Sequence, residues 1–162
     1  MSNVRQRQET AGGAWRILTD GGARGNPGPA AAGVIIQDEQ GVTLFEGGFY
    51  LGRATNNVAE YRGMIEGLKE AARLGARRVE VVSDSQLMVR QMLGEYRVKN
   101  AGLAPLYQEA RRLAEGFEEV RFSHTPREGN QEADRMVNQA LDQARNCGDA
   151  ASRRIRPAGT AT

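Results

Sequence analysis

The chain has 162 residues, of which 40% are hydrophobic and 26% are charged, a composition that suits one compact α/β domain with a buried core. No apolar run is long enough to span a membrane, and residues 1–14 are too polar for a secretory signal. The chain has one cysteine (Cys147) and one histidine (His124), which excludes an internal disulfide and a Cys/His zinc site and favours a reducing, cytoplasmic compartment. Any bound metal must have oxygen ligands, which favours Mg²⁺ or Mn²⁺.

The net charge of +2 is distributed unevenly along the chain. Residues 145–162 carry +3 and residues 1–14 carry +1, which leaves −2 for residues 15–144. A domain that binds nucleic acid is normally basic. The acidic central part therefore indicates either a different function or cations bound to clustered carboxylates.

The predicted elements begin after residues 1–14, which are expected to form a disordered tail, as is the arginine-containing segment 145–162. Three strands come first, and the short connection between the second and third predicts a hairpin. A helix with one apolar stripe follows and ends near a glycine. The predicted strands cover 15–19, 32–37, 42–50, 79–83 and 120–124, and the predicted helices cover 58–74, 85–93, 103–115 and 131–144.

This order, βββαβααβα within residues 15–144, predicts the topology of the sheet. Strands joined through a helix run parallel by right-handed crossovers, whereas the first three strands form an antiparallel meander. We therefore expect an α/β fold with a mixed, about five-stranded sheet and helices on both faces. The reactive site of such a sheet usually lies beyond the carboxyl ends of its parallel strands.

Four acidic residues are predicted to meet at this edge. Asp20 and Asp84 follow the first and fourth strands, and Glu60 and Asp134 lie in the first turns of the first and last helices. If the two strands are parallel neighbours, their carboxylates emerge at the same edge of the sheet. The two helices begin near that edge, so all four acids could converge there.

Each of these acids also has an ordinary structural explanation. Asp20 precedes two glycines, as a turn residue does. Glu60 lies three residues after Asn57, the spacing of a capping box. Asp84 could cap the helix that follows it, and Asp134 could complement a helix dipole.

The combination of four acids favours a metal site. Clustered carboxylates repel one another and raise each other's pKa unless a cation is bound. Two divalent ions would change the formal charge of residues 15–144 from −2 to about +2, which suits a polyanionic substrate. This pattern predicts two-metal phosphodiester hydrolysis.

The motifs around these acids resemble those of the ribonuclease HI family, over about Ile17 to Leu141. The resemblance implies a ribonuclease H-like fold and hydrolysis of the RNA strand of RNA/DNA hybrids by a monomer, leaving 5′-phosphate and 3′-hydroxyl ends. It implies that Asp20, Glu60, Asp84 and Asp134 are catalytic and bind two Mg²⁺ ions about 3.5–4 Å apart, for which Mn²⁺ would substitute. The motifs are Asp20–Pro29, Arg53–Glu60, Ser83–Gln86 and Gly129–Asp134.

The resemblance also implies which residues contact the substrate. RNA is distinguished from DNA by its 2′-hydroxyl, and side-chain amides can both donate to and accept from that group. Arg53 and Thr55 match a phosphate pocket for the DNA strand, and Tyr107 matches an aromatic residue on the DNA sugars, unless it packs within its own helix. Glycines permit close approach to the RNA minor groove. The remaining substrate-binding positions are Gly21, Gly22, Asn26, Asn56, Asn57 and Gln86.

One departure from the family concerns a long basic insertion that many members use to grip the substrate. Here only Gly94–Gly102 fills that space, so this is a compact form, and its hybrid affinity is either weaker or supported by the C-terminal arginines. Three alternatives remain: an enzyme that also cuts duplex RNA, a catalytically silent hybrid-binding module, and a metabolic enzyme on the same scaffold. The four intact acids disfavour the module, and the amides disfavour the metabolic enzyme.

A second departure concerns His124, the only histidine. Many family members move protons with a loop histidine, a residue suited to that work near neutral pH. The run from His124 to Asn130 aligns this residue with an earlier histidine at a strand end, and Arg127 and Glu128 replace the mobile one. We therefore expect His124 to be structural and hydrogen-bonded near the edge of the sheet. Glu128 is the auxiliary candidate for metal or proton movement, or a solvated turn residue.

The first prediction follows from this alignment. His124→Ala should keep kcat within about tenfold of the wild-type value, a change of about 1.4 kcal/mol in the barrier. Steady-state kinetics on an RNA/DNA hybrid measure this change. A loss of a hundredfold or more in a folded variant that still binds hybrid would contradict the alignment.

Overall fold

The computed structural model describes residues 13–147 and 154–155, so nearly all of the two predicted tails lies outside the described residues. The predicted order βββαβααβα is confirmed, with a short 3₁₀ helix before the last α-helix and a sixth, two-residue strand. The strands are β1 (Trp15–Ala23), β2 (Gly28–Gln37), β3 (Thr43–Ala54), β4 (Arg78–Ser83), β5 (Glu119–His124) and β6 (Arg154–Ile155). The helices are α2 (Asn56–Arg73), α3 (Gln86–Met92), α4 (Ala104–Ala114), η1 (Arg127–Asn130) and α5 (Gln131–Cys147), so α5 continues past the predicted boundary at Ala144.

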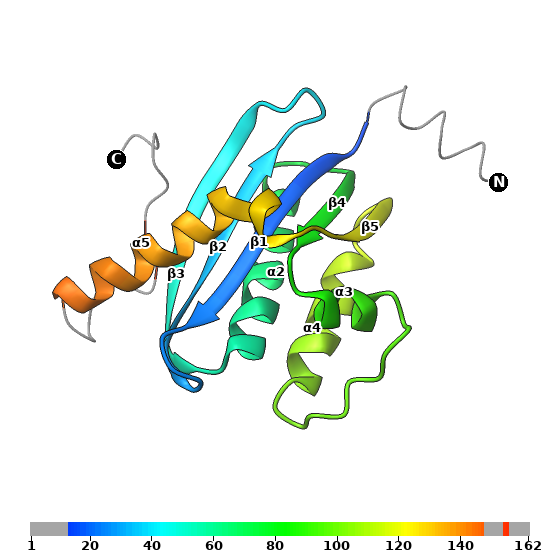
Figure 1. The fold of residues 1–162 in the computed structure, drawn as a ribbon. Helices are drawn as coiled ribbons and strands as arrows, with labels where there is room; N and C mark the ends of the chain where they lie inside the picture. Colours follow the sequence, from blue (N-terminus) through cyan, green and yellow to red (C-terminus); the bar gives the residue numbers. More distant parts are fainter. Residues whose placement is uncertain (1–12, 148–153, 156–162) are drawn as a thin grey trace.

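The strands form one mixed sheet in the order β5-β4-β1-β2-β3-β6 (Figure 1). β1, β2 and β3 are the predicted antiparallel meander, and β1, β4 and β5 are parallel. The parallel pairing of β1 with β4 ends at Thr19 and Ser83, one residue before Asp20 and Asp84. Both carboxylates therefore emerge at the same point of the sheet.

The first strand is longer than predicted. It does not end at Thr19 but continues to Ala23, and Asp20 to Ala23 pair with the neighbouring strand β2. Asp20 is therefore not a turn residue. The antiparallel ladder fixes its backbone on one side, while the side toward β4 has no further partner in the register of the parallel pair.

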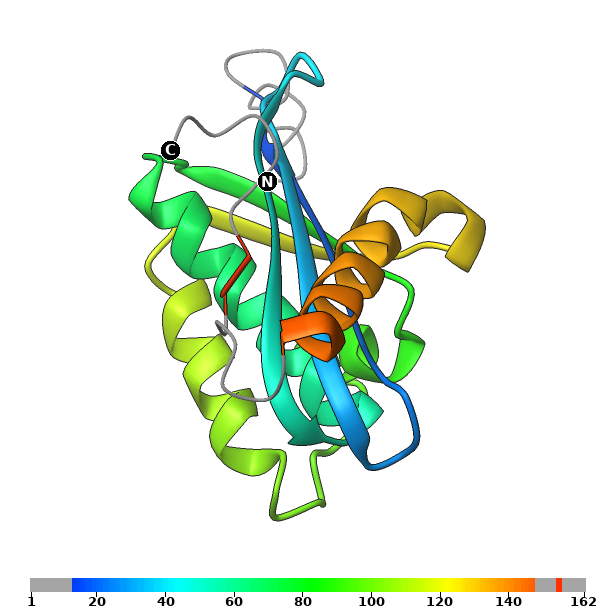
Figure 2. The same cartoon turned by 90° about the vertical axis from the view of Figure 1, so that its left-hand side faces the viewer.

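Helices cover both faces of the sheet, as predicted. Figure 2 shows α2 and α4 on one side of the sheet and α5 on the other. Alternate residues of β1 point to the two layers: Ile17 belongs to the core under α2, and Leu18 packs with Ala133 and Met136 of α5. No helix among the described residues is both long and apolar enough to cross a membrane.

Glycines let both layers of helices approach the sheet closely. A Cβ atom on Gly21 would overlap the backbone of Ala59 in α2, and one on Gly63 would press on the carbonyl oxygen of Asp20. On the opposite face, a Cβ atom on Gly33 of β2 would overlap the carbonyl oxygen of Ala133 in α5. The starts of α2 and α5 are thereby seated directly on the strands. Asp134 lies in the first turn of α5, as predicted, whereas Glu60 lies just past the first turn of α2, because this helix begins at Asn56 and not at Val58.

Gly21→Ala should destabilise the protein by about 1–3 kcal/mol, because the added methyl group forces α2 away from β1. Urea denaturation measures the change. Gly22→Ala is the matched control, since a Cβ atom there comes no closer than 4.0 Å to its nearest neighbour. Equal stability of the two variants would show that the close contact between β1 and α2 is not required.

Candidate active site

Three of the four predicted acids form a tight group. Asp20, Glu60 and Asp84 each offer a carboxylate oxygen, and these oxygens all lie within 4.8 Å of one another. Asp20 comes from β1, Asp84 follows β4, and Glu60 lies near the start of α2. Asp20 is 6% exposed, and the other two residues are half-buried. The sheet edge thus holds three carboxylates with limited access to water.

The fourth acid, Asp134, comes from the opposite layer of helices. It lies in the first turn of α5, is half-buried, and is near enough to Asp20 to contribute to the raised pKa of that residue. The start of α5 is tied to β1 by Asn130, whose buried Nδ2 donates to the carbonyl oxygen of Thr19 at 2.8 Å. Asn130 belongs to the motif Gly129–Asp134, but no role was predicted for it. Its burial between two elements could not be read from the chain.

The structure excludes a capping role for two of the acids. Helix α2 is capped by Thr55, whose hydroxyl accepts from the Val58 amide at 3.2 Å, so the alternative of a capping box formed by Asn57 and Glu60 is wrong. The helix after Asp84 is capped by Ser85 instead. Asp134 does lie in the first turn of α5, where the alternative of a helix-dipole role places it, and Glu132 lies there too.

Burial and mutual repulsion change the acidity of this group. Burial, and next the charge of Asp84, raise the pKa of Asp20 to about 8. Burial and the charges of Asp20 and Asp84 raise the pKa of Glu60 well above its ordinary value. The pKa of Asp84 is also raised, mainly by burial. Without cations, the folded site therefore holds protons at neutral pH that isolated carboxyl groups would release.

The donor set fits divalent cations with a preference for oxygen. Glu60 Oε1 is buried and has no hydrogen-bond partner, although buried polar atoms are almost always paired. A cation would satisfy this oxygen and remove the repulsion among the carboxylates. Carboxylate oxygens are the ligands that Mg²⁺ and Mn²⁺ prefer.

Two predicted substrate contacts have structural roles in the strand-to-helix connection. Asn56 Oδ1 accepts from the Ala23 amide at 2.8 Å, and Asn26 Oδ1 accepts from the Asn56 amide at 3.0 Å. These bonds tie the loop after β1 to the start of α2. Gly21 is likewise required by contact with α2 and not only by the substrate.

Other predicted contacts remain accessible at the same end of the molecule. Asn57 and Gln86 are exposed, and a Cβ atom at Gly22 would be unobstructed, so these positions can face a ligand. Tyr107 is partly buried and packs against the main core, which agrees with the alternative of ordinary helix packing.

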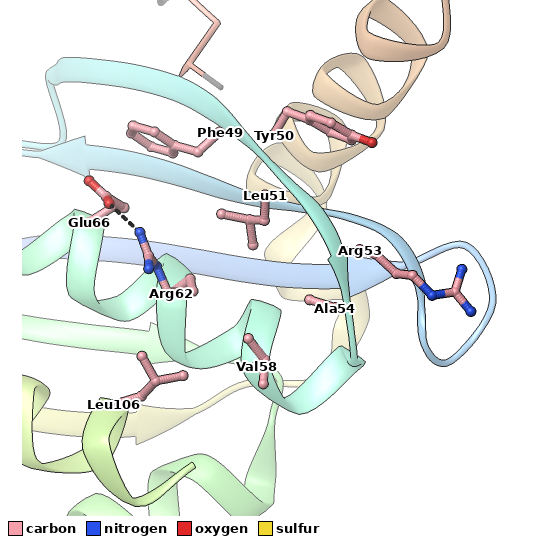
Figure 3. Close-up of a pocket in the computed structure, with 9 residues that line it drawn as sticks. All are labelled: Phe49, Tyr50, Leu51, Arg53, Ala54, Val58, Arg62, Glu66 and Leu106. Atoms are coloured by element: carbon pink, nitrogen blue, oxygen red, sulfur yellow. Dashed lines mark hydrogen bonds and ion pairs between the residues drawn. The ribbon is translucent and has the colours of Figure 1, made fainter. Parts of the chain in front are cut away.

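A groove of about 560 Å³ runs between β3, α2 and α4 and ends near Arg53. Figure 3 shows Arg62 and Glu66 facing each other across a 3.3 Å ion pair at one part of the groove, with Arg53 at the other end and pointing away from it. Arg53 is exposed, and Thr55 uses its hydroxyl to cap α2. Arg53 is therefore the member of the predicted phosphate pocket whose charged group is accessible.

Known proteins are similar to this chain in sequence and in fold. The family described as "Reverse transcriptase-like" matches residues 18–140. "Ribonuclease HI" of Halobacterium salinarum is 41% identical over 137 residues, which are 85% of this chain and 69% of that protein. The chain belongs to the ribonuclease HI family.

Two further relatives of this ribonuclease HI family member differ in how much of their own length the chain covers. The crystal structure of LC11-RNase H1 in complex with an RNA/DNA hybrid matches with a TM-score of 0.77 and 45% identity, covering 80% of this chain and 98% of that one. "Bifunctional protein Rv2228c" of Mycobacterium tuberculosis is 46% identical over 129 residues, 79% of this chain. The chain spans only 35% of the length of that mycobacterial protein.

In this member of the ribonuclease HI family, the positively charged side chain of Arg127 lies beside the acids. Arg127 Nε is 3.8 Å from Asp84 Oδ2, and its charge lowers the pKa of both Asp84 and Glu60, against the effect of burial. The Arg127 side chain is 87% exposed. Of the two residues that replace the mobile histidine, the sequence predicted an auxiliary role for Glu128 and none for Arg127. The available signal was the positive charge of Arg127 in the loop that precedes Asp134.

The expectations for Glu128 and His124 stay predictions. Glu128 is exposed on η1, next to Arg127 in the chain. His124 ends β5 in register with Ser83, is exposed, and its charge lowers the pKa of Asp84. Both residues are therefore close to the site in the sequence or in the sheet.

The raised pKa values predict how stability depends on pH. The pKa of Asp20 is about 8 in the folded protein and 3.8 ordinarily, so between these values the folded state binds a proton that the unfolded state has released. The free energy of unfolding in EDTA should therefore fall as pH rises from about 4 to about 8. Urea denaturation at about pH 5 and pH 8 measures this fall.

Asp20→Asn should reduce this fall and raise the urea midpoint at about pH 8, because the buried group no longer ionises. The control is Glu115→Gln, which removes an exposed carboxylate just after α4. A pH dependence that is the same in all three proteins would contradict the raised pKa of Asp20.

Proposed function

We propose that this protein is an endonuclease that hydrolyses the RNA strand of RNA/DNA hybrids with two divalent cations, leaving 5′-phosphate and 3′-hydroxyl ends. One observation carries the proposal: three carboxylates from separate elements lie within 4.8 Å of one another, and a buried oxygen of Glu60 lacks a partner. The relative solved with an RNA/DNA hybrid supports this choice of substrate. All four acids come from one chain, so a monomer suffices.

The acids would hold the cations and the scissile phosphate in place. Asp20, Glu60 and Asp84 would be the ligands at the sheet edge, and Asp134 would complete the site from α5. Mg²⁺ is the expected cation and Mn²⁺ the substitute, and these ions would supply charge stabilisation at the phosphate and activation of water. The seating of both helices on glycines keeps the carboxylates in position before any ligand binds.

Recognition of the hybrid would use the exposed groups around this site. Asn57 and Gln86 present amides that can both donate to and accept from a 2′-hydroxyl, the group that DNA lacks. Gly22 leaves room for close approach of the RNA strand. Arg53 would pair with a phosphate of the DNA strand, and the exposed Arg127 would attract the phosphate backbone toward the acids.

The proposal predicts cleavage of RNA/DNA hybrid in Mg²⁺ or Mn²⁺ and none in EDTA. Asp84→Asn keeps the shape of the side chain but removes a ligand charge, and kcat should fall by about a thousandfold or more, about 4 kcal/mol in the barrier. A gel assay with end-labelled RNA/DNA, RNA/RNA and DNA/DNA duplexes measures rate, substrate and end chemistry together.

Glu115→Gln is the control and should cut at the wild-type rate. Cutting in EDTA, equal cutting of DNA/DNA, or a substantial residual rate for Asp84→Asn would overturn the proposal. Cleavage of RNA/RNA alongside the hybrid would support the alternative of a broader activity. Binding of hybrid without cleavage in either metal would support the silent module.

A further inference from the structure

Asp134 is held differently from the other three acids. The backbone of Asp20 is fixed by pairing with β2, and Asp84 directly follows a strand. Asp134 is a half-buried residue in the first turn of α5. It is also absent from the group of three whose oxygens lie within 4.8 Å of one another. The direction of its carboxylate therefore depends on side chains around α5.

One such side chain lies one helical turn further along α5. Asn138 Nδ2 donates to Asp134 Oδ2 at 3.3 Å and to the Asp134 carbonyl oxygen at 3.2 Å. Residues four apart lie on the same face of a helix, so this contact is set by the helix itself. A bond to one carboxylate oxygen limits rotation of the group and leaves the other oxygen to face the site.

The amide of Asn138 is in turn oriented by Arg24, in the turn between β1 and β2. The Arg24 guanidinium donates to Asn138 Oδ1 at 3.3 Å and pairs with Asp142 Oδ1 at 2.9 Å. A guanidinium has only donors, so it must face the oxygen of the amide. The Asn138 nitrogen then has to point toward Asp134.

This chain of contacts is too exposed to serve mainly for stability. The side chains of Arg24 and Asp142 are 40% and 62% exposed, and Asn138 is an exposed residue. Ion pairs with this exposure contribute little to the free energy of unfolding. Their main effect is to orient the carboxylate of Asp134.

We propose that Asn138 is a positioning residue for Asp134, and that Arg24 orients its amide. The inference rests on the proposed function, because it assigns Asp134 to the cation site. It adds a connection from the turn after β1, which follows the substrate-facing Gly22, to the acid on α5. Asn138 does not itself contact the cations or the substrate.

The test compares Asn138→Ala with wild type in three measurements. Calorimetric titration with Mn²⁺ alone should show binding about tenfold weaker, the usual cost of losing a group that orients a metal ligand. kcat on RNA/DNA hybrid should fall by a similar factor while KM stays unchanged. The urea midpoint in EDTA should not change, since alanine suits an exposed helical position.

Three further variants test whether Asn138 orients Asp134 or whether Arg24 only attaches the turn to α5. Arg24→Ala should weaken Mn²⁺ binding in the same direction but less, and the double variant with Asn138→Ala should be no worse than Asn138→Ala alone. Asp142→Asn is the matched control: it removes the ion pair with Arg24 but leaves Asn138 on Asp134, and should behave as wild type.

The outcomes distinguish this proposal from the proposed function. Wild-type cleavage of hybrid together with unchanged Mn²⁺ binding and kcat in Asn138→Ala would overturn the positioning role alone. Loss of activity in Asp142→Asn equal to that in Asn138→Ala would also overturn it, because attachment of the turn would then suffice. If wild type fails to cut hybrid but Asn138→Ala weakens Mn²⁺ binding, the positioning role stands and the nuclease proposal fails.

Discussion

The site depends on the close contact of two helices with one sheet at positions that lack a Cβ atom. Gly21 lets α2 rest on β1, and Gly33 lets α5 rest on β2 from the opposite face. A methyl group at either position would overlap backbone, which cannot move aside as a flexible side chain can. Because Glu60 lies near the start of α2 and Asp134 in the first turn of α5, the contact also sets where their carboxylates stand relative to Asp20.

Without bound cations, this close arrangement of carboxylates is electrostatically unfavourable. Carboxylates brought together and shielded from water favour their protonated forms, as the raised pKa values of Asp20, Glu60 and Asp84 show. The fold therefore keeps groups in place that would separate if the backbone allowed it. Sites assembled against such repulsion are typical of function, since stability by itself would favour other residues.

Three cationic or polar groups moderate this cost from the periphery. Arg127 and His124 lower the pKa of Asp84, and Asn138 donates to Asp134 without adding charge. His124 ends β5, and Arg127 and Asn138 come from η1 and α5, which close the domain after it. This part of the chain therefore adjusts the geometry and charge of a site whose three clustered carboxylates come from β1, α2 and the residue after β4.

Much of the fold and the four acids could be predicted from the sequence, because apolar periodicity and strand order are local properties of the chain. The order βββαβααβα and the position of Asp84 after a buried strand followed from such patterns. Other features depended on the tertiary structure. The extension of β1 past Asp20 requires pairing with β2, and the ion pair of Arg127 with Asp84 joins separate loops. The contacts of Arg24 and Asn130 span more than 100 residues, and no local pattern encodes a distance between side chains so far apart in sequence.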